Sequence, residues 1–386
     1  MTDTPTKIRF RALDAWRGVC ALMVALFHFD AVSDFSFSFV TNSWIFVDFF
    51  FVLSGFVITH GYLDQIAGWR SAAAFVVRRF ARLWPLHIAM LLALVALELV
   101  KLPLGMIGLV TQQGGFDGLM SLATLPREIV LLNAWGTDQL YWNTPSWSIG
   151  AEFYTYLVFA LVMVLARRYW LVPACLATIA AYVLVTHSSH YIDTAFDYGI
   201  FRCIYGFFVG HLLYRFWRNR SHDATPALAT NATLIEAITL AVVVAFVCAQ
   251  APDPGPLSML APFVFGGAIY VFSAQAGRIS ALLLRRPLQN LGLWSYSIYM
   301  VHYPFVVGLN RLVKAIEQKT HITLTAPIHS GGETVYSLFF VNTYVMDFAA
   351  IVYLACVVAI SSWTYRLIEN PGRRAFAGLV RRIEGS

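Results

Sequence analysis

The feature that most constrains this chain is a series of continuous apolar segments, each close in length to a membrane-spanning helix. A hydrocarbon core requires about 20 consecutive apolar residues in helical conformation. The segments lack the alternation of apolar and polar residues that membrane β-strands show. Of the 386 residues, 59% are hydrophobic and 12% are charged, whereas soluble domains contain about a quarter charged residues. The sequence therefore predicts an all-α polytopic membrane protein.

Ten transmembrane spans follow from the positions of the apolar segments. They cover residues 12–31, 44–63, 85–102, 146–166, 170–187, 197–217, 231–250, 257–274, 289–310 and 339–365. The first span has no small-residue cleavage site after it, so it is predicted to be retained rather than removed as a signal peptide. A single membrane-embedded domain is predicted over residues 1–386, because no part of the sequence has the composition of a soluble domain.

Two of the predicted loops are long, at about 103–145 and 311–338. The first contains the stretch TLPREIVLLNAW, which is apolar enough to lie on the membrane or dip into it. Both loops fall on the outer side if the N-terminus is cytoplasmic.

Basic residues lie mostly on one side of the predicted bundle. With a cytoplasmic N-terminus, 21 of the 27 Lys and Arg residues, Lys7 among them, fall on the cytoplasmic side and five in the outer loops. This asymmetry predicts a multi-pass protein of the bacterial inner membrane with both termini in the cytoplasm. It also accounts for the net charge of +6. Membrane lipid, and no nucleic acid, is therefore expected as a partner.

The first predicted helix carries ionisable side chains that are costly to place in a bilayer. Asp14 and Arg17 are three residues apart and can pair on one face, where Asp14 is a candidate to support a substrate. Arg17 and His28 share a face about 16 Å apart, because eleven residues make three turns. Such side chains usually face the interior of a bundle. The alternative is that Arg17 snorkels to the interface and that His28 is a satisfied core histidine.

Six segments resemble the membrane acyltransferase-3 family, and they occur in the expected order. They are FRALDAWRGVCALMVALFHF (10–29), VDFFFVLSGFVI (47–58), VVRRFARLWPLHI (76–88), PSWSIGAEFYTY (145–156), SYSIYMVHYPF (295–305) and YRLIENPGRR (365–374). The resemblance implies a helical bundle that transfers an acyl group, commonly acetyl, from acyl-CoA to a carbohydrate hydroxyl. Some relatives carry a hydrolase-like C-terminal extension, which is not seen here. The membrane domain is therefore expected to perform the whole transfer or to act with a separate partner protein.

Acyl transfer to a hydroxyl requires a base, stabilisation of the oxyanion and a clamp for the donor. His28 is the predicted base, because histidine suits proton transfer near neutral pH. Arg17 is predicted to hold the donor or line its path. Glu152 shares a helix face with Ser148 and is predicted to orient or charge-stabilise His28, or to bind the acceptor; a nucleophilic Ser148 is the alternative. Asp48 is a second candidate carboxylate for the site. The alternative is a structural role, in an ion pair at the end of its helix.

A basic segment before the third span predicts the donor clamp. Arg78, Arg79 and Arg82 lie close together there, and guanidinium groups bind phosphate oxygens well. The alternative is that these arginines bind no ligand and only contribute to the charge asymmetry across the membrane. Acyl-CoA, most simply acetyl-CoA, is the predicted donor. No metal is predicted, because His187 and His190 provide only two ligands in a short loop.

Two further sets of residues are predicted to have supporting roles. Tyr296, Tyr299 and His302 form a loose stripe on one helix face, which either packs against neighbours or contacts donor or acceptor. Glu369 and Arg373 are predicted to form a structural ion pair that closes the CoA entrance.

A secondary transporter is the rival function, because carriers also hold histidines and carboxylates near the membrane midplane. A carrier needs no phosphate clamp, and it usually shows an internal repeat that this sequence lacks. The acceptor is left open among a glycan, a lipid-linked sugar and a small glycoside. Direct transfer and a relay through an acylated side chain are both open as mechanisms.

Overall fold

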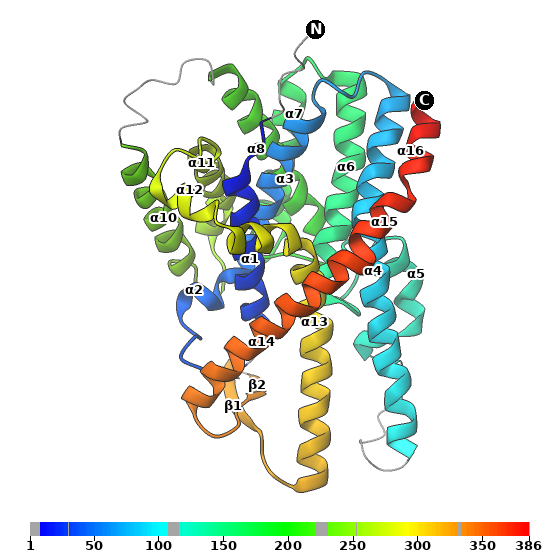
Figure 1. Ribbon diagram of the computed structural model, residues 1–386, viewed down its shortest axis with the longest axis vertical. Coiled ribbons are helices and arrows are strands. Elements are labelled where there is room, and N and C mark those ends of the chain that lie inside the picture. Colours follow the sequence, from blue (N-terminus) through cyan, green and yellow to red (C-terminus); the bar gives the residue numbers. More distant parts are fainter. Residues whose placement is uncertain are drawn as a thin grey trace.

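A bundle of helices forms the protein, with the first and last described residues at one end and a β-hairpin at the other (Figure 1). We call these the termini end and the hairpin end. The computed structural model describes residues 8–29, 31–106, 116, 118–220, 231–251, 253–330 and 333–385. Lys7 and residues 107–115 of the first long loop lie outside the described residues.

The elements alternate between long apolar helices and short connecting turns. The helices are α1 (Arg11–Phe27), α2 (Ser38–Thr41), α3 (Phe46–Tyr62), α4 (Trp69–Met106), α5 (Leu125–Ile129), α6 (Trp147–Ala166), α7 (Leu171–His187), α8 (Gly199–Arg220), α10 (Ala232–Cys248), α11 (Ala261–Ser273), α12 (Arg278–Leu283), α13 (Arg286–Thr320), α14 (Thr343–Thr364), α15 (Asn370–Ala375) and α16 (Ala377–Glu384). The strands are β1 (Thr325–Ser330) and β2 (Glu333–Leu338), which pair antiparallel.

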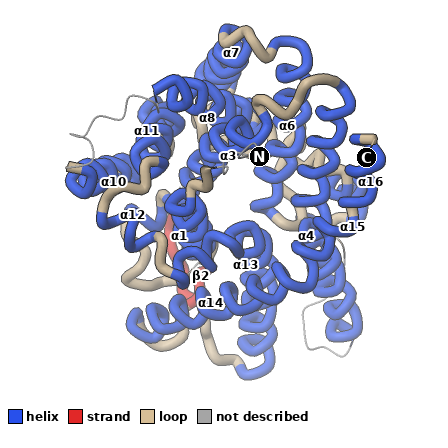
Figure 2. The backbone as a smooth tube through the Cα atoms, turned by 45° about the horizontal axis from the view of Figure 1, so that its top comes forward, coloured by secondary structure: helices blue, strands red, loops and turns tan. Residues whose placement is uncertain are grey.

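Each of the ten predicted spans coincides with a helix. Among the described residues, five helical stretches are long and apolar enough to cross a membrane by length and composition: Ser43–Tyr62, Trp69–Pro103, Thr144–Ala166, Pro256–Ser273 and Thr343–Glu384. Helices α7, α10 and α14 lie toward the outside of the bundle (Figure 2) and expose apolar side chains such as Ile179, Val242 and Phe348. Hydrocarbon tails would cover such side chains. The number of crossings and their direction stay predictions.

Two regions differ from the sequence-based expectation. The basic segment and the third span form one helix, α4, which continues through Pro85. The second long loop, predicted over 311–338, instead continues α13 to Thr320 and then forms the β-hairpin, so the protein is nearly all-α rather than wholly so. The Val32 amide donates to the Leu338 carbonyl at 3.0 Å, which ties the hairpin to the chain that follows α1.

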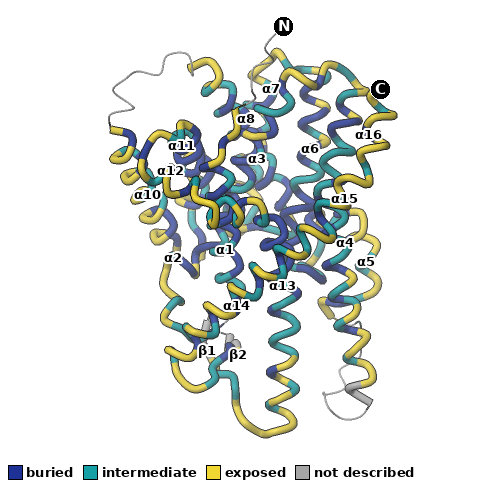
Figure 3. Tube along the Cα trace, viewed as in Figure 1, coloured by how far each residue is buried: buried dark blue, intermediate teal, exposed yellow. Residues whose placement is uncertain are grey.

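Helix α1 packs closely against α13 through glycines on both helices. A Cβ atom at Gly18 would overlap the backbone of Leu291 and Gly292, and one at Gly292 would overlap the backbone of Asp14. Small residues let helix backbones approach closely in membranes. Buried residues gather around these central helices (Figure 3), so the middle of the bundle is its best-packed part.

Helices α3 and α8 make a second close crossing. A Cβ atom at Gly55 would overlap the Phe207 carbonyl oxygen, and one at Gly210 would overlap the Val52 carbonyl oxygen. The crossing brings α3 and α8 near enough to share buried polar contacts as well as apolar ones.

A buried ion pair joins these two helices toward the hairpin end. Arg202 donates to both carboxylate oxygens of Asp48, at 3.1 and 2.7 Å, and the two side chains are 2% and 0% exposed. The guanidinium lies 5.3 Å from the ring of Trp44 and 5.4 Å from that of Trp147. The structure thus gives Asp48 an ion-pair partner, as expected if its role is structural.

The orientation of the bundle can be tested with reporter fusions at the C-terminus. We expect a reporter that works only in the cytoplasm to be active there, because the basic residues favour a cytoplasmic termini end. Activity restricted to a reporter that works only outside the cytoplasm would contradict this orientation.

Removing one partner of the buried ion pair should destabilise the fold. Asp48→Asn leaves the buried Arg202 charge with only the half-exposed carboxylate of Asp193, 3.6 Å away, and removing one partner of a buried pair costs about 3–5 kcal/mol. The measurement is thermal stability of the detergent-purified protein by size-exclusion chromatography. Asp64→Asn is the matched control, because its pair with Arg218 is exposed and should contribute little. Equal stability of the two variants would contradict the role given to Asp48.

Candidate active site

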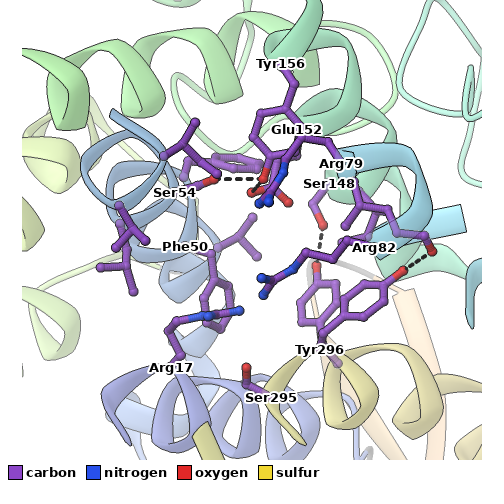
Figure 4. Close-up of a pocket in the computed structure, with 18 residues that line it drawn as sticks. Arg17, Phe50, Ser54, Arg79, Arg82, Ser148, Glu152, Tyr156, Ser295 and Tyr296 are labelled. Carbon is purple, nitrogen blue, oxygen red and sulfur yellow. Dashed lines mark hydrogen bonds between the residues drawn. The ribbon is translucent and has the colours of Figure 1, made fainter. Parts of the chain in front are cut away.

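A cavity of about 110 Å³ lies where α1, α3, α4, α6 and α13 meet, and we call it the central cavity (Figure 4). Its polar lining comes from five helices and includes several groups that carry charge. These polar residues are Arg17, Ser54, Arg79, Arg82, Ser148, Glu152, Tyr156, Ser295, Tyr296 and Tyr299. Much of the apolar lining comes from one face of α3, between Val47 and Ile58. The combination of charged and apolar walls suits a ligand that has both kinds of surface.

Glu152 brings a carboxylate into the central cavity, and the labelled arginine side chains reach the same space (Figure 4). Its Oε1 atom accepts a hydrogen bond of 2.6 Å from the Tyr156 hydroxyl, which in turn bonds to the Ser54 hydroxyl at 3.0 Å. The structure therefore places Glu152 among the arginines rather than beside His28. Of the roles predicted for this residue, the geometry favours one in a substrate cavity.

The arginines of the central cavity keep donor capacity for a ligand. Arg79 donates to the Tyr62 hydroxyl at 3.1 Å, while its Nε atom is buried and has no hydrogen-bond partner within the described part of the chain. A buried donor without a partner is unfavourable unless something binds to it. Guanidinium groups bind carboxylate and phosphate oxygens through paired hydrogen bonds. The cavity is thus suited to an anionic group.

Two larger cavities open at the termini end, and both share Arg82 with the central cavity. The first, of about 590 Å³, lies between α4 and α16, and we call it the α16 cavity. The second, of about 400 Å³, lies between the start of α1 and Glu369, and we call it the α1 cavity. Arg79 also lines the α16 cavity, and Arg17 also lines the α1 cavity. The three cavities therefore adjoin one another at these arginines, in a row from the termini end to the middle of the bundle, and we call this row the donor path.

His28 follows the last residue of α1 and lies against His302 of α13, with their ring centroids 4.9 Å apart. Each histidine has its Nδ1 atom near the backbone carbonyl four residues earlier, at 2.9 Å for Val24 and 3.2 Å for Ile298. A carbonyl oxygen can only accept, so Nδ1 carries the proton and Nε2 has a free lone pair. His302 is buried, and its Nε2 has no hydrogen-bond partner among the described residues.

Phe50 and Tyr299 stand at the boundary between the central cavity and the two histidines. Both line the cavity, and their rings meet edge to face at 5.8 Å. Tyr299 contacts the His302 ring with centroids 5.8 Å apart, and its hydroxyl shares a hydrogen bond of 2.7 Å with Ser148. The Tyr299–His302 part of the predicted stripe therefore links the cavity to His28, whereas Tyr296 points its hydroxyl at the Leu83 carbonyl.

The remaining predicted residues lie near the termini end. Asp14 pairs with Arg9 at 3.1 Å and with Arg17 at 4.0 Å. Glu369 and Arg373 are 3.8 Å apart and line the α1 cavity. These residues surround the opening rather than the central cavity itself.

Arg78 differs from the other two arginines of its segment. It forms an ion pair with Glu384 of α16 and lines the α16 cavity, but not the central cavity. The pair joins residues that are 306 positions apart, which no local pattern in the sequence could indicate.

The structure adds Tyr156, Ser54 and Phe50 to the candidate site. Tyr156 continues the spacing of four residues that relates Ser148 to Glu152, so the helix periodicity contained a signal for it. Ser54 and Phe50 lie on the same face of α3, but nothing in the sequence separates that face from the rest of an almost wholly apolar helix.

Comparison with known proteins identifies relatives over most of the chain. The acyltransferase-3 family model, described as an acyltransferase domain, matches residues 10–366. A Komagataeibacter xylinus protein described as a membrane-bound transacylase, BcsY, is 27% identical over 325 residues, which are 80% of this chain and 75% of that protein. The acyltransferase MdmB of Streptomyces mycarofaciens is 34% identical over 150 residues, 36% of this chain and 33% of its own length. No solved structure matches the chain.

Proposed function

The chain belongs to the acyltransferase-3 family, and from that premise we propose that it moves an acyl group from acyl-CoA to a hydroxyl group of a carbohydrate. The proposed acceptor is a glycan, a lipid-linked sugar or a small glycoside. The proposed location of the reaction is the inner membrane of a bacterium. One observation carries the proposal: a row of adjoining cavities lined by arginines extends from the termini end to Phe50 and Tyr299, and Tyr299 contacts His302 beside His28.

The path has the charge and length that an acyl-CoA donor needs. Arg17, Arg79 and Arg82 would bind its phosphates, because guanidinium forks match phosphate oxygens. The apolar face of α3 between Val47 and Ile58 is about 16 Å long at helical rise, and it would hold the pantetheine arm. That length equals the separation of Arg17 from His28 along α1. The thioester would therefore reach the depth of the histidines.

The rings of Phe50 and Tyr299 bound the central cavity at the end nearest the histidines and meet edge to face. With the pantetheine arm along α3, the acyl group would lie against these rings, which favours a short group. Acetyl-CoA is therefore the donor that we propose.

His28 is the base in this proposal. Its Nε2 lone pair can take the proton from an acceptor hydroxyl, because its Nδ1 proton is held by the Val24 carbonyl. The alkoxide oxygen then attacks the thioester carbonyl carbon, the C–S bond breaks, and the thiolate leaves toward the termini end. The Tyr299 and Ser148 hydroxyls donate to the Pro145 carbonyl at 3.1 and 3.0 Å in this structure, and one of them would turn toward the oxyanion of the tetrahedral intermediate to stabilise it.

Substitution of the clamp residues tests donor binding. Arg79→Ala and Arg82→Ala should each weaken CoA binding by about ten- to a hundredfold, because each removes a charge-assisted contact. The measurement is the dissociation constant for CoA in nanodiscs. Arg286→Ala is the control, since Arg286 lies outside the lining of all three cavities. If both variants fold and bind CoA with unchanged affinity, these arginines do not bind the donor and only contribute to the charge asymmetry that orients the protein.

Substitution of the proposed base separates an enzyme from a carrier. His28→Ala should lower acyl transfer by about 10²–10⁴-fold, the usual contribution of a positioned base, and leave CoA binding intact. Arg17→Ala should impair CoA binding as well as turnover, because Arg17 lines the donor path. Full activity in His28→Ala would refute its role. Solute movement across vesicles without consumption of acyl-CoA would favour the transporter.

A further inference from the structure

The C-terminal helices α15 and α16 lie beyond residue 366, where the family match ends. They run back along α4 at the termini end (Figure 1). Phe376 meets Phe80 edge to face at 5.8 Å, Val380 is buried, and Glu384 pairs with Arg78. The segment is thus fixed against α4 at three points, and it supplies one wall of the α16 cavity.

The two cavities at the termini end differ in charge. Five arginines line the α16 cavity, with Glu384 as its one carboxylate among the described residues: Arg78, Arg79, Arg82, Arg373 and Arg381. The α1 cavity has four arginines and also two carboxylates, Asp14 and Glu369, each within 4.0 Å of an arginine of that cavity. Anionic ligands are therefore attracted more strongly to the α16 cavity.

The α16 cavity also has the size and the aromatic surface for a nucleoside. Its volume of about 590 Å³ falls in the usual range for small-molecule sites, roughly 300–1,000 Å³. Tyr62 and Phe376 contribute rings to its lining. Because Arg79 and Arg82 line both this cavity and the central one, a ligand bound here could extend directly into the bundle.

We propose that α15, α16 and α4 form a binding site for the phosphorylated adenosine end of the donor, with Arg381 as a phosphate contact supplied by the C-terminal segment. This inference rests on the proposed function, because it assigns the nucleotide part of acyl-CoA to one of two openings. The site would let the protein prefer CoA thioesters over acyl groups carried on phosphopantetheine alone.

The experiment compares two fragments of CoA on one pair of variants. Adenosine 3′,5′-bisphosphate should compete with CoA for the unaltered protein and about five- to tenfold more weakly for Arg381→Gln, since one exposed charge-assisted contact is lost. The affinity for 4′-phosphopantetheine should not change. Arg382→Gln, next along α16 but outside the cavity lining, should behave as the unaltered protein.

Three results would overturn the assignment. If Arg381→Gln and Arg382→Gln bind adenosine 3′,5′-bisphosphate equally, Arg381 is not a contact. If Arg381→Gln weakens the binding of both CoA fragments equally, Arg381 affects binding only through the folded structure and is not a contact to the nucleotide. If CoA itself fails to bind the unaltered protein, both the proposed donor and the proposed nucleotide site are wrong. The first two results would contradict the nucleotide site alone and leave CoA as the proposed donor.

Discussion

Guanidinium groups inside an apolar bundle are the constraint on which the rest of this structure depends. A charged side chain is expensive to place at membrane depth, so it must face water, a counter-charge or a ligand. Arg17, Arg79 and Arg82 share the central cavity with one carboxylate, Glu152, so their charge is only partly balanced within the lining. The bundle accommodates the excess by opening toward the termini end past Arg82. An internal cavity of positive charge with such an opening is the basis of our proposal that an anionic donor enters from that end.

The sequence predicted the positions of the helices well, but it did not predict which helices contact one another. Apolar length alone located the ten helices, because each span must satisfy its own backbone hydrogen bonds. Helical periodicity also placed Arg17 and His28 on one face. It could not show that Glu152 joins the arginines or that Arg78 pairs with Glu384, since those contacts depend on which helices pack together. The β-hairpin was missed because β-strand signals are weak in a long polar loop.

Helix α1 fixes the distance between the charged opening and the histidine pair. Eleven residues separate Arg17 from His28, and a helix holds that separation at about 16 Å. The glycine contacts of Gly18 and Gly292 clamp α1 to α13, which carries His302 and Tyr299. The position of the proposed base, His28, relative to the proposed donor path is therefore set by two helices packed backbone to backbone. A loop-borne base would lack this fixed depth.

The wall between the donor path and His28 has a chemical consequence for a thioester substrate. A base with free access to both water and the donor would hydrolyse the donor, whereas a closed apolar boundary prevents that side reaction. Phe50 and Tyr299 form such a boundary on the path side, and the buried His302 fills the space behind it. In the proposed mechanism, transfer requires the acceptor hydroxyl to arrive at His28 and the thioester to pass the Phe50–Tyr299 contact. In this mechanism, these two rings would keep the thioester away from His28 until the acceptor is in place.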